Sequence, residues 1–193
     1  MISFVRVDDR IIHGQIVTRW SKEFPCDGII AVNDKAATTP VLKQSFKAST
    51  DKKVLVWTME HFLEKAQTVL DSEKRYFLIT KNPVDMKKIL VDNKFVPSDV
   101  KRVVIGPCND RPGSIKLGQN QSLIQEEAEA CEAMTNAGYD VYFALLQETA
   151  IGSWPKFRSK FGMGASLIQL FRVWDEGPRV VNHFCRERKD TIE

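Results

Sequence analysis

Residues 6–15 read Arg6-Val-Asp-Asp-Arg-Ile-Ile-His-Gly-Gln15, and the interpretation of the whole chain of 193 residues begins from this stretch. The apolar, β-branched run over residues 2–7 predicts a buried strand. Apolar residues then recur at helical spacing over residues 16–24, which predicts a helix. The polar stretch is therefore expected to form a tight loop between the first strand and the first helix.

Strand-like and helix-like patterns alternate along the rest of the chain. Further strands are predicted at residues 28–32, 53–57, 75–80, 102–105 and 139–144, with a short edge strand at 114–117. Helices are predicted between them, because capping residues such as Thr58 and Asn82 precede segments with an apolar stripe. This alternation favours parallel strands joined by helices. We therefore predict an α/β fold with a single open, mostly parallel sheet and helices on both faces.

The regular pattern ends near Gly162. A last helix is predicted over residues 154–161, and residues 163–193 are treated as an atypical C-terminal extension. In open α/β sheets, ligands bind beyond the carboxyl ends of the strands, where the winding of the chain reverses. The loop after the first strand is the usual place for that reversal, so His13 falls where chemistry is expected.

Composition and charge exclude several classes of function. The net charge of +3 is small and the basic residues are dispersed, so no nucleic-acid partner is expected. The first residues lack the pattern of a signal peptide, and no apolar run approaches the ~20 residues that span a bilayer. We therefore expect a cytoplasmic protein that reaches a membrane only by docking. The four cysteines form no C-x-x-C pair, so most are expected to be buried thiols.

The first loop collects groups that suit a phosphoryl group. The neutral imidazole of His13 is a nucleophile, and a helix N-terminus favours the neutral ring before transfer and the added phosphate after it. The backbone N–H groups of Gly14 and Gln15 are expected to point at phosphoryl oxygens, and Gly14 leaves room for their approach. Arg10 is expected to bridge two phosphoryl oxygens with its planar guanidinium.

Each of these residues also has a simpler role. Asp9 or Asp8 is able to accept a hydrogen bond from the second ring nitrogen of His13, but both are common turn and capping residues. Arg10 also fits a surface charge, and many loop histidines are only solvated. The combination at the end of the first strand makes phosphoryl transfer the stronger interpretation. Because such transfer needs mainly positioning and charge stabilisation, no metal or organic cofactor is implied.

Residues 7–20 read Val7-Asp-Asp-Arg-Ile-Ile-His-Gly-Gln-Ile-Val-Thr-Arg-Trp20 and resemble the signature loop of a known family. The family comprises the IIB components of mannose/fructose/sorbose-type, phosphoenolpyruvate-dependent sugar phosphotransferase systems. Residues 30–34, 81–85 and 103–106 are similar to further segments of that family, and the resemblance covers residues 1–162. Residues 163–193 extend beyond its usual end, and they fit a dimerisation or docking tail, a divergent end or a sequence artefact.

The resemblance implies a function and partners. His13 would take a phosphoryl group from a IIA phosphohistidine and give it to a sugar that arrives through membrane IIC and IID subunits. The chain would then be a protein-N-phosphohistidine–sugar phosphotransferase, cytoplasmic and peripherally associated with its permease, and a homodimer is consistent with the family. Asp34, Lys81 and Asn82 are candidate crevice or partner contacts, with helix capping the simpler role for Asn82.

Two other functions stay open at this point. A nucleotide-binding enzyme would use the same kind of sheet, although no G-x-G-x-x-G follows the first strand and no G-x-x-x-x-G-K-[ST] occurs. A phosphorylation sensor that kept the IIB fold but lost onward transfer is the third interpretation. The sequence leaves open which sugar is served and which nitrogen of His13 reacts.

Overall fold

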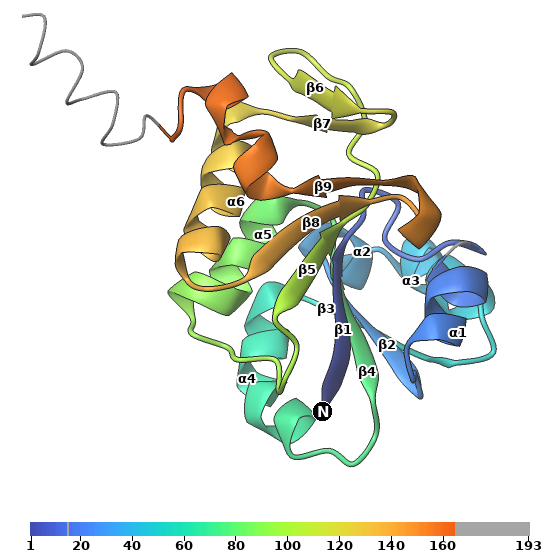
Figure 1. Cartoon of the computed structure of the whole chain (residues 1–193). Helices are drawn as coiled ribbons and strands as arrows, with labels where there is room; N and C mark the ends of the chain where they lie inside the picture. The colour runs from blue at the N-terminus through green and yellow to red at the C-terminus, as the bar shows by residue number, and fades with distance from the viewer. Residues whose placement is uncertain (15, 165–193) are drawn as a thin grey trace, which may run out of the picture.

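A computed structural model describes residues 1–14 and 16–164 of the chain. Its centre is a seven-stranded sheet with the strand order β3-β2-β4-β1-β5-β8-β9 (Figure 1). Neighbouring strands of this sheet run parallel, except that β9 pairs antiparallel with β8. The prediction of a single open, mostly parallel sheet is therefore confirmed.

The strands of the central sheet are short and largely buried. Their bounds are β1 Ile2–Val7, β2 Gly28–Val32, β3 Lys53–Trp57, β4 Tyr76–Thr80, β5 Arg102–Ile105, β8 Asp140–Ala144 and β9 Ala150–Ser153. Every residue of β2 and β4 is buried, as is typical of parallel strands covered on both faces. β1 lies between β4 and β5, so the loop that follows it is placed near the middle of the sheet.

Helices and single helical turns connect the strands. Their bounds are η1 Ile16–Trp20, α1 Ser21–Glu23, α2 Asp34–Thr38, α3 Pro40–Ala48, α4 Met59–Leu70, α5 Pro83–Lys87, η2 Lys88–Asp92, α6 Gln125–Asn136, η3 Gln147–Thr149, η4 Trp154–Lys156 and η5 Arg158–Phe161. η1 and η2 are π-helical, and η3, η4 and η5 are 3-10 turns.

The last predicted helix is replaced by the two turns η4 and η5. Trp154 and Phe157 are both buried and lie three residues apart. A 3-10 turn has three residues per turn, so it directs both side chains to the same side. Phe161 follows into the same core, and Gly162 ends the segment with a left-handed backbone conformation at φ 69°. The spacing of the three aromatic residues suits one face of either type of helix, so it explains their shared burial but not the choice of 3-10 turns.

Two apolar cores cover opposite faces of the sheet, which confirms the prediction of helices on both sides. One core packs α4, α5, η2 and α6 against the strands and contains Phe62, Met86 and Met134. The other packs η1 and α2 against the strands and contains Ile16, Trp20 and Ala36, with parts of α3 at its margin. Figure 1 shows α4, α5 and α6 on one side of the sheet and α1, α2 and α3 on the other.

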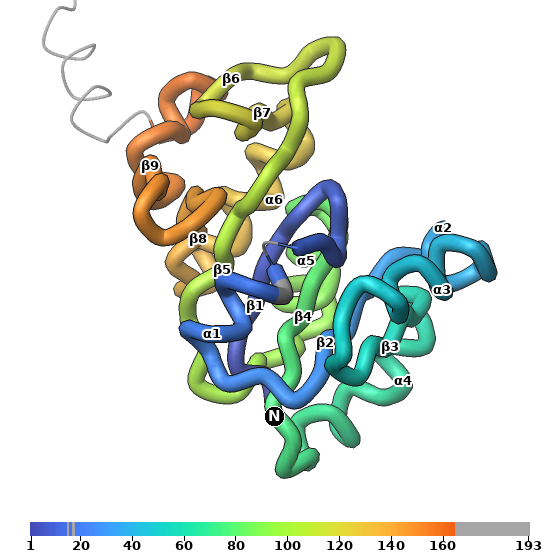
Figure 2. The backbone as a smooth tube through the Cα atoms, turned by 90° about the vertical axis from the view of Figure 1, so that its right-hand side faces the viewer, coloured from blue at the N-terminus to red at the C-terminus, as the bar shows by residue number. Residues whose placement is uncertain are grey.

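A separate hairpin stands at one end of the sheet. β6 Ile115–Gly118 pairs antiparallel with β7 Gln121–Leu123. Figure 2 shows it above the carboxyl end of β5, the end of the sheet at which the first loop also lies. The sequence predicts β6 to within one residue but misses β7 and β9. These strands have 3 and 4 residues, too few for a periodic pattern to be recognised.

Two further expectations concern membranes and cysteines. Over the described part of the chain, no helix combines the length and the apolar character needed to cross a bilayer. Cys26, Cys108 and Cys131 are buried and unbridged, as the sequence predicts, and Cys185 lies outside the described residues. Burial raises the pKa of the Cys108 and Cys131 thiols, which keeps both protonated at neutral pH.

Replacement of Phe62 by alanine tests the core between α4 and the sheet. The ring is fully buried and meets Phe95 edge-on, with 5.1 Å between the ring centroids. Because a close-packed core collapses only partly into the cavity, we expect Phe62→Ala to lower the free energy of unfolding by about 3–5 kcal/mol. Val41 on α3 is 75% exposed, so Val41→Ala is the control, with an expected change below about 0.5 kcal/mol. Chemical denaturation followed by circular dichroism measures both, and equal losses would contradict this description of the core.

Candidate active site at the carboxyl end of β1

The loop after β1 is tied to both neighbouring strands. The backbone N–H of Asp8 donates to the carbonyl of Thr80 at 2.9 Å, and that of Asp9 donates to the carbonyl of Pro107 at 3.0 Å. Ile11 closes a turn by donating to the carbonyl of Asp8 at 2.9 Å. These bonds continue the ladders from β1 to β4 and β5 beyond the last residue of β1. The loop is therefore held at the carboxyl edge of the sheet, where the sequence predicts a ligand site.

Ile11 holds the loop in a conformation that β-branched residues avoid. Its φ is 62°, in the left-handed region. Strain of this kind costs about 1–3 kcal/mol and requires compensation from the surrounding structure. The side chains of Ile11 and Ile12 are both 4% exposed and belong to the core that contains Trp20. Burial of these two side chains offsets the strain and fixes the position of the next residue, His13.

His13 directs its ring toward Asp8. The distance from Nε2 to Oδ2 of Asp8 is 3.0 Å, and the His13 side chain is 16% exposed whereas Asp8 is fully buried. The sequence left open whether Asp8 or Asp9 meets the ring, and in the structure it is Asp8. Because a carboxylate only accepts hydrogen bonds, this contact requires the ring proton on Nε2. Nδ1 is then the nitrogen that carries the lone pair.

Asp9 faces a different direction from Asp8, which corrects its expected contact with the ring. Successive residues at the end of a strand point to opposite sides. Oδ2 of Asp9 accepts a hydrogen bond from the backbone N–H of Asn109 at 3.2 Å and another from the side-chain amide of Asn109. Burial raises the pKa of the Asp9 carboxyl, and the Asn109 hydrogen bond opposes this change. Asp9 therefore fastens the first loop to the turn after β5.

Arg10 lies at the rim of the site. Its side chain is 48% exposed, and its Nε is 3.8 Å from Oδ1 of Asp8. Its backbone N–H donates to the same carboxylate oxygen at 3.1 Å. A pocket of about 150 Å³ opens beside it, lined by Arg10, Pro107, Asn109, Asn120 and Leu145. Arg10 thus combines a backbone anchored to Asp8 with a guanidinium that reaches toward solvent, which suits contact with an arriving anion.

A helical turn begins immediately after His13. Gly14 is its first residue, Thr18 donates its hydroxyl to the Gly14 carbonyl at 2.7 Å, and η1 continues the turn. A Cβ added to Gly14 would meet no atom within 4 Å, chain neighbours aside, so the space at this glycine is open. This placement agrees with the expected helix N-terminus, where backbone N–H groups favour an anion. Gln15, the second expected phosphate ligand, lies outside the described residues.

Lys81 and Asn82 line a second pocket together with Asp9. The pocket has a volume of about 400 Å³ and also includes Asn109. Asn82 additionally caps α5, because its side-chain oxygen accepts a hydrogen bond from the backbone N–H of Asp85 at 2.8 Å. The simpler role expected for Asn82 is therefore present, and both residues also lie beside the first loop.

Asp34 lies apart from this arrangement. It follows β2, which is separated from β1 by β4 in the sheet. Its carboxylate accepts a hydrogen bond from the backbone N–H of Met59 at 2.7 Å, at the start of α4. The observed contact of Asp34 is thus structural, since it joins the loops after two neighbouring strands. Within residues 1–14 and 16–164, no group of three or more His, Cys, Asp or Glu side chains is arranged to hold a metal ion.

Arg6 is the residue of the site that the sequence analysis left unassigned. It is fully buried, and its Nε donates to Oδ2 of Asp8 at 3.1 Å. Burial lowers the pKa of the Arg6 guanidinium, and Asp8 opposes this change. A signal was present in the sequence, since Arg6 and Asp8 are two residues apart in a buried strand and therefore share one face. Buried charges require a partner, so the pair is the expected solution.

Comparisons with known proteins agree with the fold and the loop. The sequence matches the family described as PTS system sorbose subfamily IIB component over residues 2–166. A probable phosphotransferase enzyme IIB component of Streptococcus pyogenes is 30% identical over 143 residues, which cover 70% of this chain and 85% of that protein. The mannose-specific EIIAB component of Escherichia coli is 27% identical over 145 residues, which cover 73% of this chain and 43% of that protein.

This chain thus spans less than half the length of the Escherichia coli relative. Among solved structures, that of manxB from Thermoanaerobacter tengcongensis has a TM-score of 0.74 and 26% identity, and the match covers 83% of this chain and 96% of that one. The family match includes the whole of the first loop and nearly all of the described residues. On these grounds, the chain belongs to the sorbose-subfamily IIB components of the sugar phosphotransferase systems.

Proposed function

We propose that this chain carries a phosphoryl group on His13, accepts it from a phosphorylated IIA protein or domain, and gives it to a sugar at a IIC/IID permease. One observation carries the proposal. The ring of His13 is held through Nε2 by a buried carboxylate, at 3.0 Å, on the edge of the sheet where ligands bind. Membership of the IIB family supports the same function and the same partners.

The proposed first step is an in-line transfer between two imidazoles. Nδ1 of His13 attacks the phosphorus, a new N–P bond forms, and the donor nitrogen leaves with the electron pair of the old bond. Positive charge develops on the His13 ring, and the Asp8 carboxylate at Nε2 stabilises it. Arg10 at the rim and the backbone N–H groups at Gly14 and Gln15 are assigned to the phosphoryl oxygens.

The second step uses the same nitrogen as a leaving group. A sugar hydroxyl attacks the phosphorus and loses its proton to water, and the electron pair of the N–P bond returns to Nδ1. The sugar is presented by the permease, so the proposal includes a cytoplasmic location with docking at the membrane. Lys81 and Asn82, which line the pocket beside Asp9, are candidate contacts for one of the protein partners. We assign residues 1–162 to this function. We also propose that two copies of the chain form a homodimer, which is consistent with the family.

Labelling of His13 tests the function directly. After incubation with a phosphorylated IIA protein, we expect a phosphate that is acid-labile and alkali-stable in the wild type and absent from His13→Ala. His61→Ala is the matched control, because His61 lies on the surface of α4 beside Glu64, at 3.5 Å from its carboxylate. Full labelling of His13→Ala would remove the proposal. Label that reaches His13 but never a sugar, in membranes that contain a permease, would indicate a sensor.

The reacting nitrogen is the second prediction. We expect NMR of the phosphorylated protein to show phosphate on Nδ1, because Nε2 faces Asp8. In Asp8→Asn the amide group is able to donate to Nε2 and thus to move the ring proton to Nδ1, so we expect phosphorylation to slow by about 10²-fold or more, as for other wrong-tautomer variants. Rates are measured by rapid-quench labelling. Phosphate on Nε2 of the wild type would contradict the assigned roles of both residues.

The third prediction concerns the rim cation. A preorganised donor to a developing anion contributes about 3–4 kcal/mol in a dry site, but the Arg10 side chain is 48% exposed and solvent screens part of this contribution. We therefore expect Arg10→Ala to slow transfer by about 10- to 100-fold without a change in thermal stability. Arg19 is an exposed arginine on η1, and Arg19→Ala provides the charge-matched control, with wild-type rates expected. Equal rates in both variants would show that Arg10 takes no part in the transfer.

A further inference from the structure

A buried cation beneath the proposed phosphoryl site has contacts that the proposed reaction does not explain. Besides its bond to Asp8, Arg6 donates from Nη1 to the carbonyl of Ala144 at 3.1 Å and from Nη2 to the carbonyl of Leu145 at 3.3 Å. These carbonyls lie at the carboxyl end of β8, two strands away from β1. The guanidinium therefore reaches across β5, with all three of its nitrogens bonded to fixed acceptors.

The neighbouring strand leaves room for this reach. Gly106 follows β5, and a Cβ added there would stand 2.3 Å from Nη2 and 2.6 Å from Cζ of Arg6. The nearest atoms to that Cβ all belong to the guanidinium, and Gly106 is not among the glycines with positive φ. Glycine is required at this position for space rather than for backbone freedom.

An aromatic side chain covers the guanidinium. The Trp20 ring centroid is 5.0 Å from Cζ of Arg6, within the range of a cation–π contact. The indole Nε1 donates to the same Leu145 carbonyl at 3.3 Å. Trp20 belongs to η1, the turn that follows His13, so the segments on either side of His13 converge on Arg6. The guanidinium is thus fixed by three hydrogen bonds and one aromatic contact.

One oxygen of Asp8 connects this cation to the histidine. Oδ2 accepts from Nε of Arg6 at 3.1 Å and lies 3.0 Å from Nε2 of His13. Because the guanidinium is planar and its two Nη atoms are fixed, the direction of the Nε hydrogen bond to Asp8 is fixed as well. The direction of the carboxylate in turn sets the ring plane of His13 and the nitrogen that bears the proton.

We propose that Arg6 is a positioning residue for phosphoryl transfer, which acts through Asp8 to keep the His13 proton on Nε2 and to turn Nδ1 toward the phosphoryl donor. The inference rests on the proposed carrier function of His13 and adds to it a residue that is fully buried and does not contact the phosphoryl group. A role in stability alone makes a different prediction, because loss of Arg6 would then lower the folding stability but leave the ring tautomer unchanged.

A double-mutant cycle between Arg6 and Gly106 tests the inference. Gly106→Ala removes no polar group but displaces the guanidinium, so we expect it to slow phosphorylation of His13 by about 10- to 100-fold. In the Arg6→Met background, the same substitution has no guanidinium to displace and is expected to change the rate less than about 2-fold. Contacting residues give such non-additive effects, whereas independent ones add. If the rate reductions of the two single variants multiply in the double variant, Gly106 and Arg6 act independently and the proposal is overturned.

The ring tautomer supplies a readout that a purely structural role would not move. We expect imidazole ¹⁵N NMR of the unphosphorylated wild type to show the proton on Nε2, and Gly106→Ala and Arg6→Lys to show a mixture of tautomers. Arg6→Lys keeps the charge but lacks the planar fork, so it tests geometry if Arg6→Met does not fold. An Nε2–H tautomer that is unchanged in both variants would overturn the proposal.

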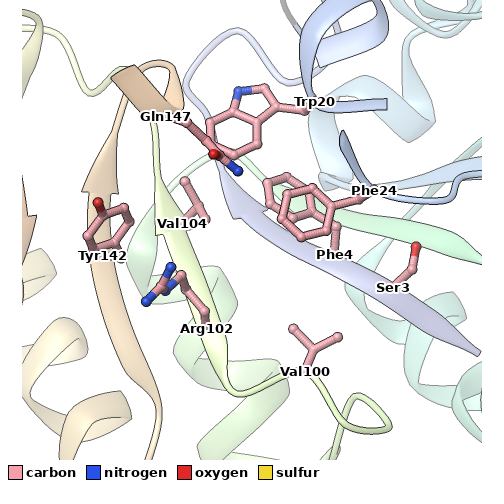
Figure 3. A pocket seen from close by; sticks show the side chains of 9 residues that line it. All are labelled: Ser3, Phe4, Trp20, Phe24, Val100, Arg102, Val104, Tyr142 and Gln147. Atoms are coloured by element: carbon pink, nitrogen blue, oxygen red, sulfur yellow. The ribbon is translucent and has the colours of Figure 1, made fainter. Parts of the chain in front are cut away.

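Arg102→Met provides the matched control. Arg102 lies on β5 and, like Arg6, contacts both an aspartate and an aromatic ring. Its Nε is 2.7 Å from a carboxylate oxygen of Asp140, and its Cζ is 4.4 Å from the Tyr142 ring centroid. Figure 3 shows Arg102 beside Tyr142, at the edge of an open hollow that Trp20 borders on the far side. We expect wild-type rates and tautomer in this variant. Absence of label from the wild type would instead reject the carrier function, and the tautomer measurement would still decide the role of Arg6.

Discussion

The buried carboxylate of Asp8 is the group on which both the fold around β1 and the proposed chemistry depend. Its backbone N–H extends the ladder to β4, while its side chain receives Arg6, the Arg10 backbone N–H and the ring of His13. Burial of a carboxylate away from water costs much folding free energy unless hydrogen-bond donors satisfy its lone pairs. Removal of one partner of a buried ion pair lowers stability by more than the net contribution of the pair, because it leaves an unpaired charge. The partners of Asp8 are therefore interdependent. The same hydrogen bonds that make a buried charge tolerable also give the partly buried His13 ring a defined orientation.

The topology explains why these partners meet. β1 lies between β4 and β5, and the loops that follow the three strands converge at one edge of the sheet. Asp9 bonds to Asn109 after β5, and Lys81 and Asn82 follow β4, so the first loop has a neighbour on each side. Arg6 adds the end of β8 to this set. Segments more than a hundred residues apart in sequence thus define the surroundings of His13, and these surroundings require β1, β4, β5 and β8 to be assembled.

The sequence predicted most of the fold because central parallel strands are continuous apolar runs, bounded by turn residues. The strand predicted at residues 75–80 is observed as Tyr76–Thr80, and those at 28–32 and 53–57 are observed with the same bounds. The strands β7 and β9 have too few residues to show a periodic pattern, and the helix predicted at residues 154–161 is observed as the two turns η4 and η5. At the site, a local motif made His13 and Arg10 candidates, and the structure places both on the loop after β1. The motif was not enough to choose between Asp8 and Asp9, because the faces of the sheet are assigned only when β4 and β5 are in place. The carbonyl partners of Arg6 are backbone atoms, which no residue pattern reveals.

The distribution of contacts around His13 fits a group that must be both accepted and released. If His13 is a carrier, one nitrogen is first a nucleophile and then a leaving group, so tight binding of the phosphoryl group itself would slow the second step. The buried interactions of this site lie beneath the ring, where Asp8 accepts a hydrogen bond from Arg6 and orients His13. The cation assigned to the phosphoryl oxygens, Arg10, is about half exposed, and solvent screens its charge. The interactions that orient the imidazole are therefore separate from those assigned to the phosphoryl group.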